Sequence, residues 1–229
     1  HVSAVHVQTS PVDPRSADIR IFDDHGLELD KRSERRLEGL FFREDIRRVS
    51  HYEMGRIVRR DGQTERYVDD MIAKLDLEKV RGAGFKVLID YNNGSAATVL
   101  PRVLQEMNAT VIPLNASPAE IVMEQDESTF RERLREMGLI VSAVKAKLGV
   151  FIDTPGERCF LVDETGTVLD HDTAFAVLTQ LALAGRPGMV LGPASASLAF
   201  SMIAEQMNGR FVPTKITPGS VLRAAQHAD

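Results

Sequence analysis

The alternation of apolar and polar residues divides the central part of the chain into strands and helices joined by short links. From Phe85 onward, four runs read as strands: FKVLID, ATVIPLN, VFID and RCFLVDE. Three stretches between and after them space their apolar residues as helices do: SAATVLPRVLQEMN, STFRERLREMGLIVSAVKAKLG, which would end at its glycine, and DTAFAVLTQLALAG. Strands that alternate with helices in this way form a mostly parallel sheet with helices on both faces. The pattern therefore predicts an α/β fold.

The flanking parts of the chain show the same pattern less completely. Two strand-like runs and one helical stretch come first: SAVHVQT, DIRIFD and DKRSERRLEGLFFRED. The polar, aperiodic stretch HYEMGRIVRRDGQTER then indicates a connector. After the Gly/Pro break AGRPG, the order strand, helix, strand, helix begins again but has too few strands for a complete sheet. We expect three pieces, residues 1–67, 68–186 and 187–229, with an incomplete first and last piece.

Two polar loops of the central piece follow directly after strands. YNNG follows KVLID, and DTPGER follows VFID. Because crossover connections in parallel sheets have one hand, the carboxyl ends of the strands lie at one edge, where ligands bind. We expect both loops at that edge. Gly94 serves the tight turn, and the backbone N–H groups around Asn93 either receive an anion or only close the turn.

Composition and charge narrow the classes of partner. The formal net charge is −5, which argues against a protein that binds duplex nucleic acid. No apolar run approaches the roughly 18 residues of a membrane span. The first residues, HVSAVHVQTSP, lack the basic start and long apolar centre of a signal peptide. We therefore expect no nucleic-acid partner and no membrane partner.

The single cysteine, Cys159, excludes an internal disulfide and is consistent with a reducing cytoplasm. It lies in the apolar run CFLV, so we expect a small buried side chain. The chain is expected to be a cytoplasmic protein.

The order of these motifs resembles domain 2 of the α-D-phosphohexomutases, the phosphoglucomutase and phosphomannomutase enzymes. The resemblance rests on KVLIDYNNGSAATVLPRVLQEMNATVIPLN, the amphipathic helix after it, KLGVFID and ERCFLVDETGTVLDHD. VHVQTSPVDPRSADIRIFDDHGLEL is similar to the latter part of domain 1, and GMVLGPASASLAFSMIAEQMNGRFVPTKIT to the start of domain 3. The resemblance implies three-layer α/β/α domains with a mixed, mostly parallel sheet. It also implies that the start of domain 1, the rest of domain 3 and all of domain 4 are missing.

The chemistry that the resemblance implies is phosphoryl exchange between a phosphoserine and a hexose, with Mg²⁺ and basic groups to neutralise charge. The catalytic loop of the family, Thr-x-Ser-His-Asn-Pro, is similar to residues 8–14, and Ser10 falls on the serine. Pro11 and Val12 replace the polar pair, and neither side chain can donate a hydrogen bond to a phosphate. Ser10 is therefore either a nucleophile or an ordinary turn serine.

The metal loop of the family, Asp-Gly-Asp-x-Asp-Arg, is similar to residues 153–158. Asp153 and Arg158 match, whereas Pro155 and Glu157 replace the second and third carboxylates. Mg²⁺ tolerates misplaced ligands poorly. We favour a turn with a surface ion pair between Glu157 and Arg158 over a two-carboxylate Mg²⁺ site, and we expect Asp153→Asn to change neither Mg²⁺ affinity nor stability.

A narrower resemblance concerns DIRIFDDHGLEL followed by RRLEGLFFREDIRRV. It is similar to a subgroup in which a degenerate mutase-like region is fused behind a mannose-1-phosphate guanylyltransferase, a nucleotidyltransferase domain. The favoured hypothesis is a catalytically degenerate module with a structural or regulatory role in such a protein.

Two alternatives remain open. One is an active phosphohexomutase that uses Mg²⁺, with Arg158, Asn93 and Gly94 binding a hexose phosphate or another ligand of sugar-nucleotide metabolism. The other is an unrelated doubly wound nucleotide-binding domain, for which YNNGSA is a poor phosphate loop. An assembly of identical chains is compatible with each.

Overall fold

The computed structural model describes residues 3–10, 13, 15–44, 47–118, 126–215 and 217–226. The chain forms two compact units. Unit 1 combines residues 1–58 with residues 175–229, and unit 2 consists of residues 59–174. The predicted division at 1–67, 68–186 and 187–229 stays a prediction.

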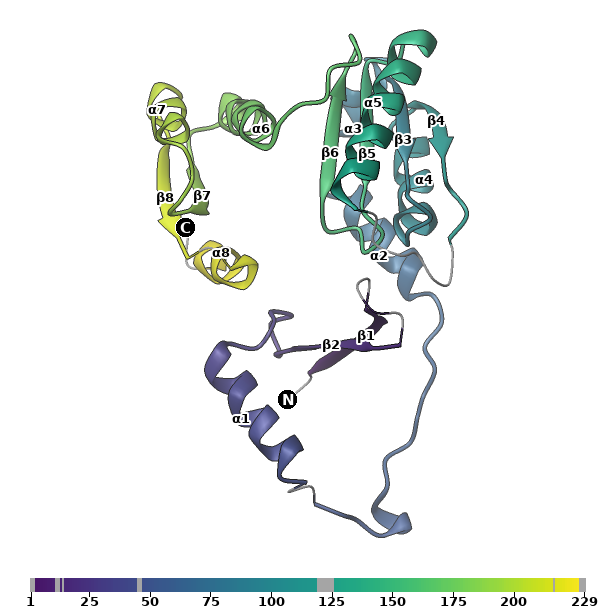
Figure 1. The fold of residues 1–229 in the computed structure, drawn as a ribbon, viewed down its shortest axis with the longest axis vertical. Coiled ribbons are helices and arrows are strands. Elements are labelled where there is room, and N and C mark those ends of the chain that lie inside the picture. Colours follow the sequence, from purple (N-terminus) through teal and green to yellow (C-terminus); the bar gives the residue numbers. More distant parts are fainter. Residues whose placement is uncertain are drawn as a thin grey trace. The chain divides into compact units, whose positions relative to one another are not determined.

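Unit 2 is built around a four-stranded sheet with the order β4-β3-β5-β6 (Figure 1). The central strand β3 (Lys86–Asp90) pairs in parallel with β4 (Thr110–Leu114) and with β5 (Leu148–Ile152). The edge strand β6 (Cys159–Asp163) pairs antiparallel with β5. The sheet is therefore mixed and mostly parallel, which confirms the predicted fold class.

Helices cover both faces of this sheet. α4 (Ala96–Glu106) lies on one face and α5 (Glu127–Val144) on the other (Figure 1). Because side chains alternate along a strand, Leu88 packs toward α5, whereas its neighbours Val87 and Ile89 pack toward α4. Both faces of β3 are thus buried, which explains its continuous apolar run. Two further helices of unit 2 are α2 (Gln63–Ile72) and α3 (Leu77–Arg81).

α5 ends earlier than the sequence predicts. The helix stops at Val144, and Lys145 adopts a left-handed conformation with φ 54°. The N–H of Lys147 already donates to the carbonyl of Lys86 in β3, so the residues up to Gly149 join the sheet. Gly149 is needed for close packing, since a Cβ there would lie 2.6 Å from Val141 Cγ2 of α5.

Unit 1 contains two separate two-stranded sheets. β1 (Ala4–Thr9) pairs antiparallel with β2 (Ala17–Phe22), and β7 (Met189–Pro193) pairs in parallel with β8 (Arg210–Thr214). The other elements are α1 (Lys31–Phe42), the 3₁₀ helix η1 (His51–Glu53), α7 (Leu198–Gln206) and α8 (Pro218–Gln226). α6 (His171–Gly185) begins in unit 2 and continues into unit 1.

The hairpin of unit 1 repeats the hairpin of unit 2 in sequence and in hydrogen bonding. FDDHGLELD begins at Phe22, the last residue of β2, and VDETGTVLD begins at Val162, near the end of β6. Asp23 Oδ1 accepts from the N–H groups two and four residues later, and Asp163 Oδ1 does the same. The caps are also equivalent, because Asp30 accepts N–H groups at the start of α1 and Asp170 accepts one at the start of α6.

The strand–helix–strand segment β7-α7-β8 similarly repeats β3-α4-β4. In both segments the helix is followed by an asparagine in the left-handed conformation, Asn108 with φ 56° after α4 and Asn208 with φ 57° after α7. The strand that follows contains a proline in both cases. Each helix also runs between two parallel strands. Unit 1 therefore contains a counterpart of the β5–β6 hairpin and a counterpart of the β3-α4-β4 segment.

Within the described ranges, no helix has both the length and the apolar character needed to cross a bilayer.

Cys159 is exposed, so the prediction of a buried side chain is wrong. The residue begins the edge strand β6 directly after the polar loop, where its side chain stays accessible to solvent.

Candidate functional site

The carboxyl ends of three neighbouring strands meet at one edge of the unit 2 sheet. Asp90 ends β3, Asn115 follows β4, and Asp153 follows β5. The register aligns these ends, because Asp90 lies opposite Leu114 of β4 and Phe151 of β5. The two loops that the sequence places at this edge are therefore close together, as predicted.

Asp90 is the centre of the hydrogen-bond network at this edge. Its Oδ1 accepts from the backbone N–H of Asn92 at 2.8 Å and from Asn115 Nδ2 at 2.9 Å. Its Oδ2 accepts from Arg133 Nη2 of α5 at 3.1 Å. Asp90 is only 5% exposed, so an ionised carboxylate without partners would lower the stability of the fold there. The arginine and the amides compensate for that burial.

Asn92 connects the YNNG loop to the DTPGER loop. Its Nδ2 donates to Thr154 Oγ1 at 3.0 Å, and its Oδ1 accepts from Arg133 Nη1 at 2.8 Å. The guanidinium also lies 5.2 Å from the centre of the Phe151 ring. Asn92 and Asn93 are both left-handed, with φ 46° and 54°, a conformation that asparagine tolerates better than most residues.

The backbone of the YNNG loop is bonded to the protein itself. The N–H of Asn93 donates to the carbonyl of Asn115 at 2.9 Å, and the N–H of Gly94 donates to the carbonyl of Tyr91 at 2.8 Å. Asn93 Nδ2 donates to the carbonyl of Ser117 at 2.8 Å. These contacts favour the turn-closing interpretation of Asn93 and Gly94 over anion binding. Their assignment to substrate binding stays a prediction.

Gly94 also brings the two loops into backbone contact. A Cβ at this position would lie 2.5 Å from the carbonyl oxygen of Thr154, closer than real contacts allow. The glycine is therefore required by the approach of Thr154.

The DTPGER loop closes on the carboxylate of Asp153. Asp153 Oδ1 accepts from the N–H of Glu157 at 2.8 Å and from the N–H of Arg158 at 3.0 Å, and Oδ2 accepts from Arg158 Nε at 2.9 Å. The N–H of Gly156, which has φ +75°, donates back to the Asp153 carbonyl at 2.9 Å. The loop is thus an aspartate-stabilised turn, like the turns after β2 and β6.

These contacts do not fit a Mg²⁺ site. The carboxylate that would be the principal ligand already accepts three hydrogen bonds, one of them from a cationic guanidinium. Mg²⁺ needs carboxylate oxygens at about 2.1 Å in octahedral geometry, and Pro155 offers no side-chain oxygen. Within the part of the chain that the structure describes, no three acidic, histidine or cysteine side chains are grouped to hold a metal ion. Asp153 and Glu157 as metal ligands remain a prediction without geometric support.

The hydrogen bonds of Asp153 also revise the expected effect of Asp153→Asn. The side chain is 11% exposed and ties both ends of the loop together, so its replacement is expected to lower stability. Arg158 is the exposed partner, with 68% of its side chain accessible. A guanidinium in that position can still present its other nitrogens to a ligand.

Ser10 directly follows β1 in unit 1. Its N–H donates to the carbonyl of Ser16 at 2.9 Å, which closes the loop between β1 and β2. Within this loop, Asp13 accepts from the N–H of Arg15 and from Ser16 Oγ, each at 3.0 Å. These bonds hold the pKa of the Asp13 carboxyl below its usual value. Pro11 and Val12 lie outside the described residues, so their predicted effect on Ser10 is not tested.

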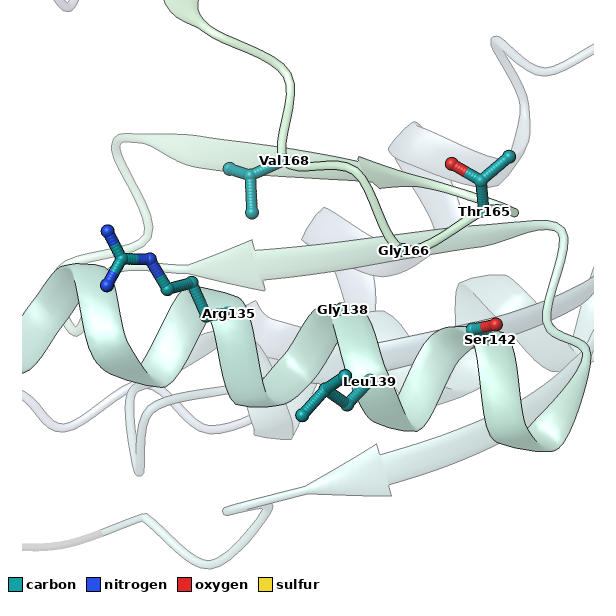
Figure 2. Close-up of a pocket in the computed structure, with 7 residues that line it drawn as sticks. All are labelled: Arg135, Gly138, Leu139, Ser142, Thr165, Gly166 and Val168. Atoms are coloured by element: carbon teal, nitrogen blue, oxygen red, sulfur yellow. The ribbon is translucent and has the colours of Figure 1, made fainter.

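A shallow hollow elsewhere in unit 2 contains none of the predicted site residues. It lies between the outer side of α5 and the turn after β6 (Figure 2). It is lined by Arg135, Gly138, Leu139, Ser142, Thr165, Gly166 and Val168. Two of these lining residues are glycines whose backbones approach closely: a Cβ on Gly166 would lie 2.5 Å from the carbonyl oxygen of Gly138. The hollow therefore marks a close helix–turn contact.

Four residues of the Asp90 network were not predicted from the sequence to lie at the site: Asn92, Asn115, Arg133 and Thr154. A signal existed for Asn115, which follows β4 as Asp90 ends β3. Arg133 carried a weaker signal, since it is next to Leu134 on the buried side of an amphipathic helix. Thr154 gave none, because its contacts depend on how the loop folds.

The sequence is similar to that of known phosphohexomutases. The family described as phosphoglucomutase/phosphomannomutase, alpha/beta/alpha domain II matches residues 65–166. The phosphoglucomutase/phosphomannomutase of Thermococcus kodakarensis is 27% identical over 212 residues, which are 92% of this chain and 46% of the relative. A phosphoglucosamine mutase of Chelativorans sp. is 32% identical over 165 residues, 71% of this chain and 36% of the relative.

A solved structure shows the same fold. A phosphoglucomutase/phosphomannomutase family protein from Burkholderia thailandensis superimposes with a TM-score of 0.81 at 15% identity. The match covers 99% of this chain and 48% of that protein. The chain thus spans about half the length, or less, of the relatives that it matches.

Proposed function

The domain II match and the mutase relatives support the phosphohexomutase superfamily as the family of this chain, and on that premise we propose a catalytically degenerate, mutase-like module. In this proposal the module has a structural or regulatory role in sugar-phosphate metabolism. The family support argues against the alternative of an unrelated nucleotide-binding domain.

One observation carries the proposal: the Asp153 carboxylate is bonded to its own loop. Its oxygens accept from two backbone N–H groups and from the Arg158 guanidinium. Phosphoryl transfer in this superfamily needs a cation to neutralise the charge of the transferring group. A carboxylate that is neutralised by arginine, in a loop where Pro155 replaces the second carboxylate of the family pattern, is a poor ligand for that cation.

A second candidate function, an active phosphohexomutase, is favoured by two observations. The curated relatives are named as mutases, and Ser10 lies in the loop after β1, where the family serine is expected. In that case the Ser10 hydroxyl would carry the phosphoryl group, and Arg158 would bind a phosphate or sugar oxygen. Mg²⁺, held by Asp153 and Glu157, would supply charge neutralisation.

The ligand and the cellular setting are further parts of the proposal. The ligand class is a hexose phosphate, and the phosphoglucosamine mutases among the relatives extend it to hexosamine phosphates. The parent protein is proposed to be of the mannose-1-phosphate guanylyltransferase type, located in the cytoplasm. A symmetric assembly of such chains is compatible with this role.

Phosphorylation of Ser10 separates the two functions. The chain is incubated with glucose 1,6-bisphosphate and Mg²⁺, and its intact mass is measured beside that of Ser10→Ala. The degenerate module is expected to show no added phosphoryl group in either protein. A phosphoryl group that appears on the unaltered chain and is lost in Ser10→Ala would establish the active mutase instead.

A further inference from the structure

Thr154 occupies the second position of the DTPGER loop, where the metal loop of the family pattern has a glycine. Its side chain makes a contact that a glycine could not make, because Thr154 Oγ1 accepts a hydrogen bond from Asn92 Nδ2 at 3.0 Å. Asn92 belongs to the YNNG loop, 62 residues earlier in the chain. The threonine therefore adds a side-chain connection between the two loops at the edge of the sheet.

Asn92 is oriented for this contact by the groups on its other side. Its backbone N–H donates to Asp90 Oδ1 at 2.8 Å, and its Oδ1 accepts from Arg133 Nη1 at 2.8 Å. A guanidinium can only donate, so the amide turns its oxygen toward Arg133 and its NH₂ group toward Thr154. That NH₂ group needs an acceptor, and the threonine hydroxyl oxygen provides it.

The contacts of Asn92 begin in the core of unit 2. Arg133 Nη2 donates to the buried carboxylate of Asp90 at 3.1 Å. The next residue of α5, Leu134, is 6% exposed and belongs to the apolar cluster between α5 and the sheet. A continuous series of contacts thus leads from α5 through Asn92 to Thr154.

The backbone around Thr154 is held as well. A Cβ on Gly94 would lie 2.5 Å from the Thr154 carbonyl oxygen and 2.8 Å from its Cα, so the two backbones are in close contact. The preceding residue, Asp153, accepts the N–H groups of Glu157 and Arg158. The first two residues of the loop are therefore fixed, Asp153 by its own loop and Thr154 by the neighbouring loop.

These contacts supply an order that a metal loop obtains from its cation. Carboxylates that surround a metal ion repel one another until the ion binds, so metal binding and local folding are coupled. To turn its carboxylate toward a cation, Asp153 would have to release the N–H groups of Glu157 and Arg158. Thr154 is bonded to the next loop and opposes that movement of its neighbour.

We infer that Thr154 is a positioning residue that holds the DTPGER loop in its metal-free form. The hydrogen bond from Asn92 fixes the loop where the family pattern uses a cation. Thr154 acts through the conformation of Asp153 and Arg158 and touches no ligand in this role. The inference rests on the proposed function in one respect, namely that the loop binds no cation. It goes further because it assigns the loss to residue 154 as well as to the missing carboxylates.

Hydrogen exchange of the Glu157 and Arg158 amides tests this role, because both N–H groups donate to Asp153. Thr154→Val keeps the shape of the side chain but removes the acceptor, and we expect both amides to exchange at least about tenfold faster. Thr154→Ser keeps the hydroxyl group and is expected to retain the protection to within about threefold.

Thr165→Val is the matched control. Thr165 also lies in an aspartate-stabilised turn, where its Oγ1 donates to Asp163 at 2.6 Å, and this variant is expected to leave the Glu157 and Arg158 amides unchanged. Unchanged exchange of these two amides in Thr154→Val would overturn the inference.

A double variant isolates the contact between the two side chains. In the Asn92→Ala background the donor is already gone, so Thr154→Val is expected to accelerate exchange no further. An acceleration of the same size with and without Asn92 would show that Thr154 acts by another route and would also overturn the inference.

A Mg²⁺ titration tests the consequence for the cation. Two variants carry Pro155→Asp with Glu157→Asp, and one of them also carries Thr154→Gly. We expect the variant with glycine to bind Mg²⁺ at least about tenfold more tightly than the variant that keeps Thr154. Equal affinity, or binding by neither variant, would contradict the role of Thr154. Failure of the proposed function gives a different result, namely Mg²⁺ binding or Ser10 phosphorylation in the unaltered chain.

Discussion

Arg158 holds Asp153 at two points: its Nε donates to Oδ2 at 2.9 Å, and its backbone N–H donates to Oδ1 at 3.0 Å. The side chain that the family pattern assigns to a metal is therefore neutralised by the arginine five residues later. The pair closes the loop between β5 and β6 in the manner of a structural turn. The exposed guanidinium remains accessible at the same edge of the sheet as Asp90.

Replacing Asp153 is expected to lower the stability of unit 2. In Asp153→Asn one oxygen can still accept the backbone N–H groups, but an amide NH₂ replaces the oxygen that accepts from the Arg158 guanidinium. We therefore expect the free energy of unfolding to fall by about 1–2 kcal/mol. The measurement is urea unfolding followed by circular dichroism. Asp70→Asn, on the exposed side of α2, is the matched control and is expected to change stability little. Equal stability of the two variants would contradict the structural role of Asp153.

The interaction between Arg133 and Asp90 is expected to matter more than a surface ion pair. Arg133→Met leaves the buried Asp90 carboxylate without its cation, and we expect a loss of about 2–3 kcal/mol in the free energy of unfolding. Arg131→Met is the control, because Arg131 pairs with Glu127 on the exposed side of α5. That pair is expected to contribute less than about 0.5 kcal/mol. A similar loss in both variants would refute the buried network.

Gly94 is expected to tolerate no side chain. In Gly94→Ala the new methyl group would meet the carbonyl oxygen of Thr154 at 2.5 Å, so the two loops must separate. We expect a loss of about 1–3 kcal/mol. Gly82→Ala is the control, since a Cβ there meets nothing within 4 Å. Thermal unfolding of both variants checks this, and an unaffected Gly94→Ala would show that the loops do not touch.

Acid is expected to destabilise the helix caps and turns. Hydrogen bonds to Thr165 and Thr167 hold the pKa of Asp163 below its usual value, and bonds to Thr173 do the same for Asp170. A carboxyl group with a lowered folded-state pKa stabilises the fold above its unfolded pKa of about 3.9, and this stabilisation is lost as the pH falls toward the folded value.

The urea midpoint is therefore expected to fall when the pH drops from about 5 to about 2. In Asp163→Asn the fall should be smaller, because that variant has one titrating turn carboxylate fewer. A midpoint that does not change over this range, or an unchanged pH dependence in Asp163→Asn, would contradict the assignment.

Much of the fold could be predicted from the sequence because its signals are local. The apolar run Val87–Ile89 can be buried on both faces only in a covered parallel sheet, and the polar loops after such strands must meet at one edge. This reasoning placed Asn93 and Asp153 at the same edge, where the structure has them. The repeated turn also follows local rules, since Asp23, Asp153 and Asp163 each lie three residues before a glycine and accept N–H groups of the turn.

The remaining features depend on contacts between distant residues. α5 ends at Val144 because β5 must begin in time to pair with β3, and no local signal marks that point. Arg133 joins the site because α5 crosses the sheet near Asp90, which the helix pattern alone does not reveal. The hydrogen bonds that Asp153 accepts from the N–H groups of Glu157 and Arg158 could not be predicted either, because they depend on how the loop backbone folds.

Restoring the family pattern should restore the metal site. In the variant Thr154→Gly, Pro155→Asp and Glu157→Asp, the loop regains its three carboxylates, and we expect Mg²⁺ binding with a Kd of about 1 mM or tighter. The matched control carries Pro155→Asn in place of Pro155→Asp and is expected to bind more weakly, since it lacks one charge.

The most direct test of the degenerate loop is a Mg²⁺ titration of the unaltered chain, by calorimetry, beside Asp153→Asn and the restored variant. The account predicts no saturable binding below about 1 mM for the unaltered chain or for Asp153→Asn, and binding only in the restored variant. Saturable binding by the unaltered chain that disappears in Asp153→Asn would contradict it.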